Sequence, residues 1–486
     1  MNAFTSSDHT TYPFATTNAV DYENLRDVYL DATLHPLLKE TDFRQEGWRV
    51  GPGDVADPKS PLLFKGVVYN EMKGQMSDAS YLFYIRFQDH IFPSINNSGG
   101  DPEKITDLVL ENLREFHKKH YHPSNSKIFT YGDIPIKAHL KKLNDKLSTF
   151  EKIKVEKELR EPIKLDAPQR LRVYGPHDPL MDKDSQYKTS VSWIMNNTSD
   201  ILETFSLRVL SNLLLDGYGS PMYRGLIEAK LGSDFSPNTG YDTSSKTGIF
   251  SVGLQNVRQE HVQQVGDTIH KVLQEMRARG FDAKKVDGVL HQLELGLKHV
   301  SLLNTDALMI NALTVSILQK TANFGMSVMQ SLTTGWFNGV DPFEALSVEE
   351  TVSKFKELYA KGGYLEGLLE KYFLNRNTLT FTMAPDRDYS KALAAEEATR
   401  LSREIKKYGG ETAARGPLTK REAELAEIQE LAKKQDVSCL PTLKVEDIPR
   451  NMEKKELKTG EIEGVPVQWR IAPTNGLTYF RGKFLS

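Results

Sequence analysis

Helical and strand-like hydrophobic patterns alternate along almost the whole chain, and this alternation restricts the fold more than any single motif. One early segment, which Asp21 could cap, has apolar residues at the 3.6-residue spacing of an amphipathic helix: Leu25, Val28, Tyr29 and Ala32. Short apolar runs typical of strands occur between such segments. Mixed α/β or α+β layers are therefore expected. With 486 residues the chain is long enough for roughly three domains, each with a core.

The first 150 residues contain a second helical pattern and a candidate strand. Asp101-Pro102 has the composition of a helix start, and one face of the predicted helix carries Ile105, Leu108, Val109, Leu113 and Phe116. The segment Lys127–Tyr131 predicts a strand that ends at a turn beginning with Gly132. Polar, Lys-rich text from Asn144 to Pro168 indicates a boundary.

A second block of similar composition follows this boundary. Tyr187–Met195 predicts a strand, and a strongly apolar helix after it should end near Gly217. Ser220-Pro221 predicts the start of the next helix, and Thr247–Leu254 predicts another strand. Two long helices are then expected between residues 259 and 299.

The last hundred residues carry two further predictions. The segment Tyr389–Gln435 is rich in Ala, Glu, Lys and Arg and is interrupted at Gly409-Gly410 and Gly416-Pro417, which predicts a helical hairpin that connects domains. The segment Val465–Tyr479 alternates around Thr474-Asn475-Gly476, which predicts a β-hairpin. A lone hairpin is marginally stable, so we expect it to begin a further domain.

Composition excludes several broad classes of protein. The net charge of −3 gives no basic field for nucleic acid or an anionic membrane. No apolar run approaches the roughly 20 residues of a membrane span. The first residues form neither an Arg-rich amphipathic stretch nor a signal peptide. Cys439 is the single cysteine, which excludes an intrachain disulfide and a thiolate zinc knuckle and is consistent with a reducing compartment.

Common catalytic motifs are absent from the sequence. It contains no phosphate-binding GxxxxGK[ST], no GxSxG and no HExxH. Gly217-Tyr218-Gly219 begins a dinucleotide-binding pattern, but the third glycine is replaced by Met222 and the preceding segment is helical. A tight turn between helices is the better interpretation.

Glu71 is the most informative carboxylate. If the surrounding segment is helical, Val67 and Val68 lie on the same face as Glu71, which would place a charge on an apolar stripe. A buried carboxylate must be paired, hydrogen-bonded or bound to metal. From spacing alone, a structural ion pair or helix cap is favoured over a metal ligand. A solvent-exposed Glu71 far from the first few residues would count against a metal site.

Two groups of histidines are weaker metal candidates. His117, His120 and His122 lie at a predicted helix end, where imidazoles can hydrogen-bond terminal carbonyls. His291, Glu294 and His299 lie on one predicted helix and nearly match HxxEH. Histidines eight residues apart are separated by about 12 Å along a helix, which is too far for one zinc ion.

Long stretches of the chain resemble the pitrilysin-type inverted-zinc metallopeptidases, and in particular their mitochondrial presequence-degrading branch. The matching stretches are MNAFTSSDHTTYPF (Met1–Phe14), NLRDVYLDATLHPLL (Asn24–Leu38), FRQEGWR (Phe43–Arg49), PLLFKGVVYNEMKGQMSD (Pro61–Asp78), SGGDPEKI (Ser98–Ile105), FHKKHYHPSNSKIFTYGD (Phe116–Asp133), GSPMYRGLIEAKLGSDFSP (Gly219–Pro237) and HQLELGLKH (His291–His299).

The resemblance implies an α+β fold with four parts. They are a first α/β peptidase domain (residues 1–150, truncated at its N-terminus), a second, homologous α/β domain (165–388), a helical hairpin linker (389–440) and a partial strand pair that starts a truncated third domain (441–486). In the family, two such halves enclose a chamber that degrades short unstructured peptides. A mitochondrial location, in the matrix or the intermembrane space, is expected by resemblance.

The resemblance also implies roles for five residues. Glu71 matches the distal glutamate that completes the family's zinc site, which reverses the preference stated above for a structural ion pair. Asn2, Ala3, Phe4 and Thr5 match the edge strand on which the substrate backbone pairs. Zinc is the expected cofactor and unstructured peptides are the expected partners.

The catalytic residues of the family do not carry over to this sequence. It contains no HxxEH, so no catalytic residue is assigned, and one carboxylate cannot hold zinc tightly. We therefore expect the chain to be inactive alone, as a partial gene product, an isoform or a fragment that a complementing C-terminal half could complete. The alternatives are a non-catalytic peptide-binding relative and, less favoured, a zinc enzyme built on His291, Glu294 and His299.

Overall fold

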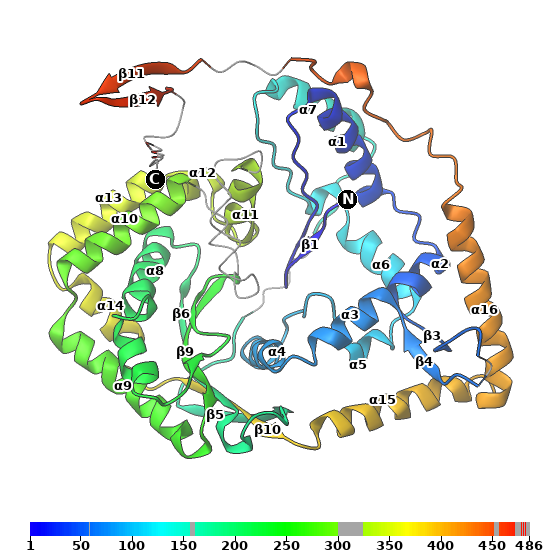
Figure 1. Cartoon of the computed structure of the whole chain (residues 1–486), viewed down its shortest axis with the longest axis horizontal. Coiled ribbons are helices and arrows are strands. Elements are labelled where there is room, and N and C mark those ends of the chain that lie inside the picture. The colour runs from blue at the N-terminus through cyan, green and yellow to red at the C-terminus, as the bar shows by residue number, and fades with distance from the viewer. Residues whose placement is uncertain are drawn as a thin grey trace.

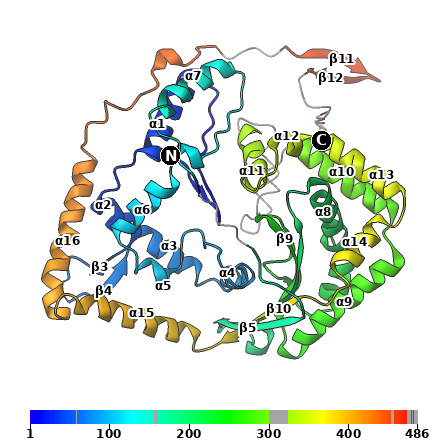
Figure 2. The ribbon, with the colours of Figure 1, turned by 180° about the vertical axis from the view of Figure 1, so that it is seen from behind.

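The computed structural model describes residues 1–57, 59–155, 161–299, 324–451 and 456–471, together with positions 478, 480 and 482. Helices and strands are mixed throughout, which confirms the predicted α+β class. Figures 1 and 2 show an open ring, with the first 150 residues on one side, a sheet and its helices on the other, and the final helices along the rim. Within these residues, no helix combines the length and the apolar character needed to cross a membrane.

A six-stranded mixed sheet organises the second half of the ring. Its strands are β5 (Gln169–Pro176), β6 (Tyr187–Asn197), β7 (Asp234–Phe235), β8 (Gly240–Asp242), β9 (Thr247–Val257) and β10 (Leu379–Asp386). The order is β5-β10-β6-β9-β7, and β8 also pairs with β9. The pair β5 and β10 is parallel, whereas β10, β6 and β9 are antiparallel to one another. The strands predicted at Tyr187–Met195 and Thr247–Leu254 are thereby confirmed.

Alternate residues of these strands enter two different cores. Trp193 and Phe250 belong to the large core that the sheet shares with its own helices. Ile249 and Phe381 point to the other face, where they pack with Phe83 and neighbouring residues of helix α4 from the N-terminal region. This is the period-2 pattern of a strand buried on both faces. The second core therefore joins the two sides of the ring.

The helices of the second half match the sequence prediction closely. They are α8 (Ile201–Leu215), α9 (Val262–Arg279), α10 (Ala283–His299), α11 (Phe324–Phe337), α12 (Pro342–Leu346), α13 (Val348–Ala360) and α14 (Tyr364–Tyr372). Gly217 follows α8 with a φ of 76°, which is a conformation that favours glycine. The next helical segment begins at Pro221, and the Ser220 hydroxyl accepts a hydrogen bond from the Tyr223 amide. Gly217-Tyr218-Gly219 is thus a turn between helices.

The N-terminal region is mainly helical. It contains strands β1 (Phe4–Thr5), β2 (Thr10–Thr11), β3 (Arg49–Pro52) and β4 (Leu62–Lys65), and helices α1 (Ala19–Leu34), α2 (Glu40–Asp42), α3 (Val67–Gln75), α4 (Ala79–Ile91), α5 (Pro102–Ile105), α6 (Leu110–His120) and α7 (Ile136–Leu147). Strands β1 and β2 form one antiparallel pair, and β3 and β4 form another. In the described part of this region, no larger sheet corresponds to the one in the second half.

Three predictions for this region are wrong in detail. Asn18 rather than Asp21 caps α1, since its side chain accepts hydrogen bonds from the amides of Val20 and Asp21. The helix that starts after Asp101 ends at Ile105, and a second helix begins at Leu110. Val109 between them has an extended backbone, and the preceding carbonyl accepts a hydrogen bond from the Trp48 indole instead of continuing the helix.

The segment Lys127–Tyr131 is not part of a sheet, contrary to the prediction. Its β-forming residues need a neighbouring strand, and no strand in the described part of the chain pairs with it. Its neighbour is helix α11 instead, as the side-chain contacts below show.

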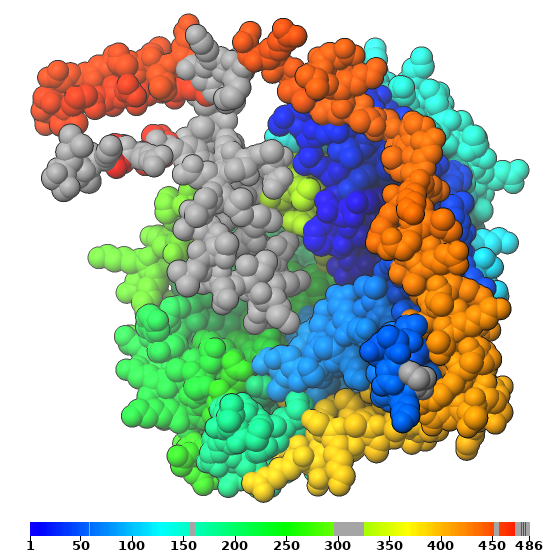
Figure 3. Space-filling model, turned by 45° about the vertical axis from the view of Figure 1, so that its right-hand side comes forward, coloured from blue at the N-terminus to red at the C-terminus, as the bar shows by residue number. Residues whose placement is uncertain are grey.

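Two linker helices follow the sheet, as predicted. Helix α15 (Tyr389–Lys406) and helix α16 (Glu411–Ala432) meet at Gly409-Gly410, where both glycines have positive φ. Pro417 lies inside α16, so the expected interruption there does not occur. Figure 1 shows α15 along the lower edge and α16 rising along the side. Figure 3 shows the chain continuing from α16 over the N-terminal region, where the Asp447 carbonyl accepts a hydrogen bond from Asn18.

The C-terminal hairpin lies earlier in the chain than predicted. Strands β11 (Lys458–Ile462) and β12 (Val465–Trp469) pair through a turn at Glu463-Gly464, both with positive φ. Positive φ at both central residues is typical of the hairpin turn that matches strand twist. The predicted turn at Thr474-Asn475-Gly476 lies outside the described residues.

Candidate peptide-binding and metal site

A large cavity lies between the N-terminal region and helix α11. Its volume is about 1590 Å³, and its wall includes β2, α1, the loop after α4, the segment after α6 and the end of α11. The wall is rich in aromatic side chains, which provide apolar surface for a ligand. The aromatic residues are Tyr12, Phe14, Tyr22, Tyr29, Phe116, Tyr121, Phe129, Tyr131, Trp336 and Phe337.

The first residues of the chain form a short edge strand beside this cavity. Phe4 and Thr5 pair with Thr11 and Thr10, and Thr5 lines the cavity. The amide of Asn2 donates a hydrogen bond of 2.9 Å to the Tyr29 hydroxyl, which attaches the strand to α1. The side chains from Asn2 to Thr5 are exposed, and in the described chain no strand covers the outer edge of β1. An extended peptide could add to that edge through backbone hydrogen bonds.

A tyrosine pair closes the wall behind the strand. The hydroxyls of Tyr12 and Tyr121 lie 2.8 Å apart, and Tyr121 stacks on His117. Burial raises the pKa of Tyr12 well above its usual value, and the hydrogen bond to Tyr121 adds to the rise. The Tyr12 hydroxyl therefore stays protonated at neutral pH and holds β2 against the end of α6.

Helix α11 is attached to the N-terminal region at both of its ends. The ring of Phe337 stacks on His9 with 5.1 Å between centroids, and the Lys127 ammonium lies 4.5 Å from the Trp336 ring. At the other end, a Cβ on Gly325 would lie 2.6 Å from the Tyr131 ring, so only glycine fits there without movement. These contacts complete the cavity wall from a segment about 200 residues further along the chain.

The environment of Glu71 differs from the sequence prediction. Helix α3 buries Tyr69 and Met72, whereas Val67 is 53% exposed and Glu71 is exposed. The predicted apolar stripe on the Glu71 face is therefore wrong, because α3 turns its other face to the core. Glu71 accepts a hydrogen bond of 3.3 Å from Gln75, the residue one turn later. Burial thus gives no argument for a metal at Glu71, and its role has to be argued from the family.

The histidine candidates are not gathered into a metal site. His117 Nε2 lies 2.9 Å from the Thr33 carbonyl at the end of α1, and His122 Nδ1 accepts a hydrogen bond from the Ser124 amide. His291 and Glu294 lie on α10 as predicted, but His291 is exposed and the His299 side chain lies outside the described residues. In the described part of the chain, no three His, Cys, Asp or Glu side chains lie close enough together to hold a metal ion.

Sequence reasoning missed the cavity wall. The tyrosine pair joins residues 109 positions apart, and Trp336 and Phe337 belong to a helix that was not assigned from the sequence. The aromatic residues concentrated between Phe116 and Tyr131 were a signal that could have indicated part of this wall.

Comparison with known proteins identifies the family. One family model, described as the peptidase M16 inactive domain, matches residues 107–293. A second model, described as a region associated with subfamily C of the same peptidases, matches residues 383–485. The chain belongs to the M16 peptidase family. The resemblance to its presequence-degrading branch is confirmed by close relatives.

Three relatives named mitochondrial presequence protease illustrate this similarity. The chain is 55% identical over 488 residues to the protein from Gibberella zeae, 44% identical over 489 residues to that from Schizosaccharomyces pombe and 41% identical over 489 residues to that from Saccharomyces cerevisiae. These alignments cover 99%, 99% and 100% of this chain but 47%, 46% and 46% of the relatives. The chain therefore spans about half the length of the curated relatives it matches.

Solved structures are similar only at a distance. The first half of the periplasmic protease PqqL from Escherichia coli aligns with a TM-score of 0.48 at 14% identity, covering 82% of this chain and 79% of that one. This likeness is too weak to support an inference by itself.

Proposed function

We propose that this chain is the peptide-holding part of a mitochondrial zinc metallopeptidase that degrades short, unstructured peptides such as presequences. The observation that carries the proposal is the similarity to proteins named mitochondrial presequence protease over 99% of the chain. The aromatic cavity beside an open edge strand is consistent with it, because such a surface suits an extended peptide. We further propose domain boundaries near residues 150–165, 388 and 440.

In this proposal the first residues bind the substrate backbone. The amides and carbonyls of Asn2, Ala3, Phe4 and Thr5 would pair with the peptide as an added strand, and the adjoining cavity would receive its side chains. Strand addition requires an extended, unfolded partner. This requirement favours short unstructured peptides over folded proteins.

Glu71 is the proposed metal ligand in this chain. Its carboxylate is of a donor type that zinc accepts, and it lies on a helix with its charge exposed rather than in a buried ion pair. Catalytic zinc usually takes three protein ligands, so Glu71 needs partners beyond those in the described residues. When bound, zinc would lower the pKa of its water and polarise the scissile carbonyl.

Alone, the chain is proposed to bind peptides without cleaving them. The sequence has no HxxEH, and therefore neither the paired imidazoles nor the general base of the family motif. A complementing C-terminal half is the proposed partner, since the relatives are about twice as long. The second candidate function is a permanently non-catalytic peptide binder, which the metal-independent edge strand favours.

Peptide affinity with and without a chelator tests the proposal. We would titrate the chain into a fluorescent, unstructured basic peptide and measure anisotropy with zinc and with EDTA. Binding that persists in EDTA, with no cleavage in either condition, is expected for this chain under both candidate functions. Absence of binding would contradict both.

A second experiment separates the two candidates. Joining the chain to a segment that carries HxxEH, and adding the second half, should produce zinc-dependent cleavage if the chain belongs to a peptidase. If the assembled protein binds peptide and zinc but does not cleave, the non-catalytic interpretation replaces the peptidase.

A further inference from the structure

Helix α3, which carries Glu71, is held from the opposite side by the linker helix α15. Tyr69 and Lys73 lie four residues apart on one face of α3, and each is two residues from Glu71. Two residues correspond to a rotation of about 200° on a helix, so Glu71 points away from these two side chains. The linker therefore contacts the helix without covering the proposed ligand.

Glu397 makes this contact from the middle of α15. Its Oε1 accepts a hydrogen bond of 3.0 Å from the Tyr69 hydroxyl and one of 2.8 Å from the Lys73 ammonium, and its Oε2 lies 2.7 Å from the same ammonium. Burial raises the pKa of Tyr69 well above its usual value, and the charge of Glu397 raises it further. The Tyr69 hydroxyl thus remains a donor at neutral pH.

Arg400, almost one turn later, attaches α15 to the helix beside α3. Its Nη1 donates to the Pro102 carbonyl at 3.1 Å and to the Thr106 hydroxyl at 2.8 Å. Its guanidinium also lies 5.6 Å from the ring of Phe64 on β4, over the core that contains Tyr69. Arg400 is 8% exposed. The two contacts together fix α15 against the base of α3.

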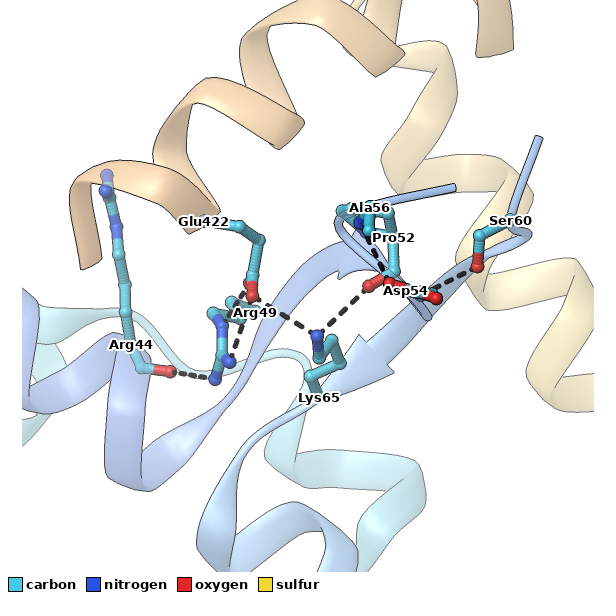
Figure 4. A network of polar contacts seen from close by, with 8 residues as sticks. All are labelled: Arg44, Arg49, Pro52, Asp54, Ala56, Ser60, Lys65 and Glu422. Atoms are coloured by element: carbon cyan, nitrogen blue, oxygen red, sulfur yellow. Dashed lines mark hydrogen bonds and ion pairs between the residues drawn. The ribbon is translucent and has the colours of Figure 1, made fainter. Parts of the chain in front are cut away.

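The second linker helix holds the strand that leads into α3. Figure 4 shows Glu422 of α16 between Arg49 and Lys65, which lie opposite each other on β3 and β4. Lys65 also donates to the Pro52 carbonyl at 3.0 Å. Gly66 then starts α3 with a φ of 152°, and a Cβ there would lie 2.1 Å from the Gly47 carbonyl oxygen. The path from Glu422 to the start of α3 is therefore short and tightly packed.

We propose that Glu397 and Arg400 are positioning residues for Glu71, and that the linker sets the orientation of the helix carrying it. This inference rests on the proposed role of Glu71 as a zinc ligand. A metal site tolerates little displacement of its ligands. A linker that holds the ligand helix directly would couple the placement of whatever lies beyond the linker to the readiness of the metal site.

The test measures the motion of α3 in this chain without metal. Amide hydrogen exchange would be compared between the parent chain, Glu397→Ala and Glu404→Ala. Glu404 is a matched control, because it lies on the same helix and pairs with Lys407 of α15 itself. We expect exchange across Val67–Gln75 to become about tenfold faster in Glu397→Ala, since charge-assisted hydrogen bonds are lost. Glu404→Ala should leave it unchanged.

A spin label at position 71 gives an independent reading. In a Cys439→Ser background, a label on Glu71→Cys should become more mobile in Glu397→Ala and in Arg400→Ala, and intermediate in Glu397→Gln, which keeps an acceptor for Tyr69. Unchanged exchange and unchanged label mobility would overturn the proposal. So would faster exchange that extends equally to α8, because Glu397 would then be a general stabilising residue.

Neither measurement involves zinc. A failure here therefore removes the positioning role and leaves the assignment of Glu71 as a ligand open to its own test.

Discussion

The carboxylate of Glu422 on α16 forms an ion pair with Arg49 on β3, across 373 positions of sequence. The Glu422 side chain is only 7% exposed, and Lys65 lies on its other oxygen at 3.2 Å. A Cβ at Gly51 would lie 2.6 Å from the same carboxylate, so the helix and the hairpin are in close contact. This carboxylate thus joins the linker to the N-terminal region.

Replacing Glu422 by Ala should destabilise the chain by about 2 to 3 kcal/mol, because two partly buried cations lose their partner. Urea unfolding at neutral pH would measure the change in the free energy of unfolding. The control is Glu350→Ala, which removes an exposed pair with Lys354 and should have no measurable effect. A loss as small as that of the control would show that the ion pair adds nothing to stability.

Stability should also fall on the acid side through the same group. Burial raises the pKa of Glu422, but the hydrogen bond and charge of Arg49, together with Lys65, lower it more, so the folded value lies below the ordinary one. A lowered folded pKa gives stability that is present above the unfolded value of about 4.3 and is lost as the pH falls through the folded value. Unfolding free energies between neutral pH and acid should show a smaller decline in Glu422→Gln than in the parent chain. Parallel curves would contradict the assignment.

The Tyr12–Tyr121 pair gives a prediction for the cavity wall. Tyr121→Phe leaves the half-buried Tyr12 hydroxyl without its partner and should cost about 1 kcal/mol of unfolding free energy. Tyr218→Phe, which changes a tyrosine that is 81% exposed, is the matched control and should be neutral. Equal behaviour of the two variants would mean that the hydroxyl contact does not stabilise the wall.

Substrate binding by strand addition can be tested at a single position. Phe4→Pro removes a backbone amide from β1, whereas Phe4→Ala keeps the amide and removes only the exposed ring. If the peptide pairs with the strand, proline should weaken affinity by about tenfold or more and alanine much less, as measured by fluorescence anisotropy. A similar loss in both variants would instead indicate that the Phe4 ring binds the peptide.

The sequence predicted the second half of the ring better than the first, for a physical reason. Around Trp193 and Phe250, strands and helices are strongly apolar, so the local pattern agrees with the final packing. Lys127–Tyr131 has a strand-like composition, but a strand also needs a neighbour, which local pattern does not supply. The position of Glu71 depended on which face of α3 the linker covers. That contact comes from Glu397, more than 300 positions away.

The candidate site shows the same division. Asn2–Thr5 and Glu71 came from resemblance to a family rather than from spacing, and their proposed roles still rest on it. The aromatic cavity is formed by segments brought together only in the folded chain, such as Tyr12 with Tyr121 and His9 with Phe337. Spacing in sequence carries no information about such pairs.

Zinc content tests the central claim most directly. A protein that joins this chain to a segment carrying HxxEH would be dialysed against buffered zinc, and the bound metal would be measured by mass spectrometry for the parent, Glu71→Gln and the exposed control Glu46→Gln. We predict about one zinc per chain in the parent and in the control, and a clear loss in Glu71→Gln, because a catalytic zinc site needs its third protein ligand. Full zinc occupancy in Glu71→Gln would contradict the assignment of Glu71 as a zinc ligand.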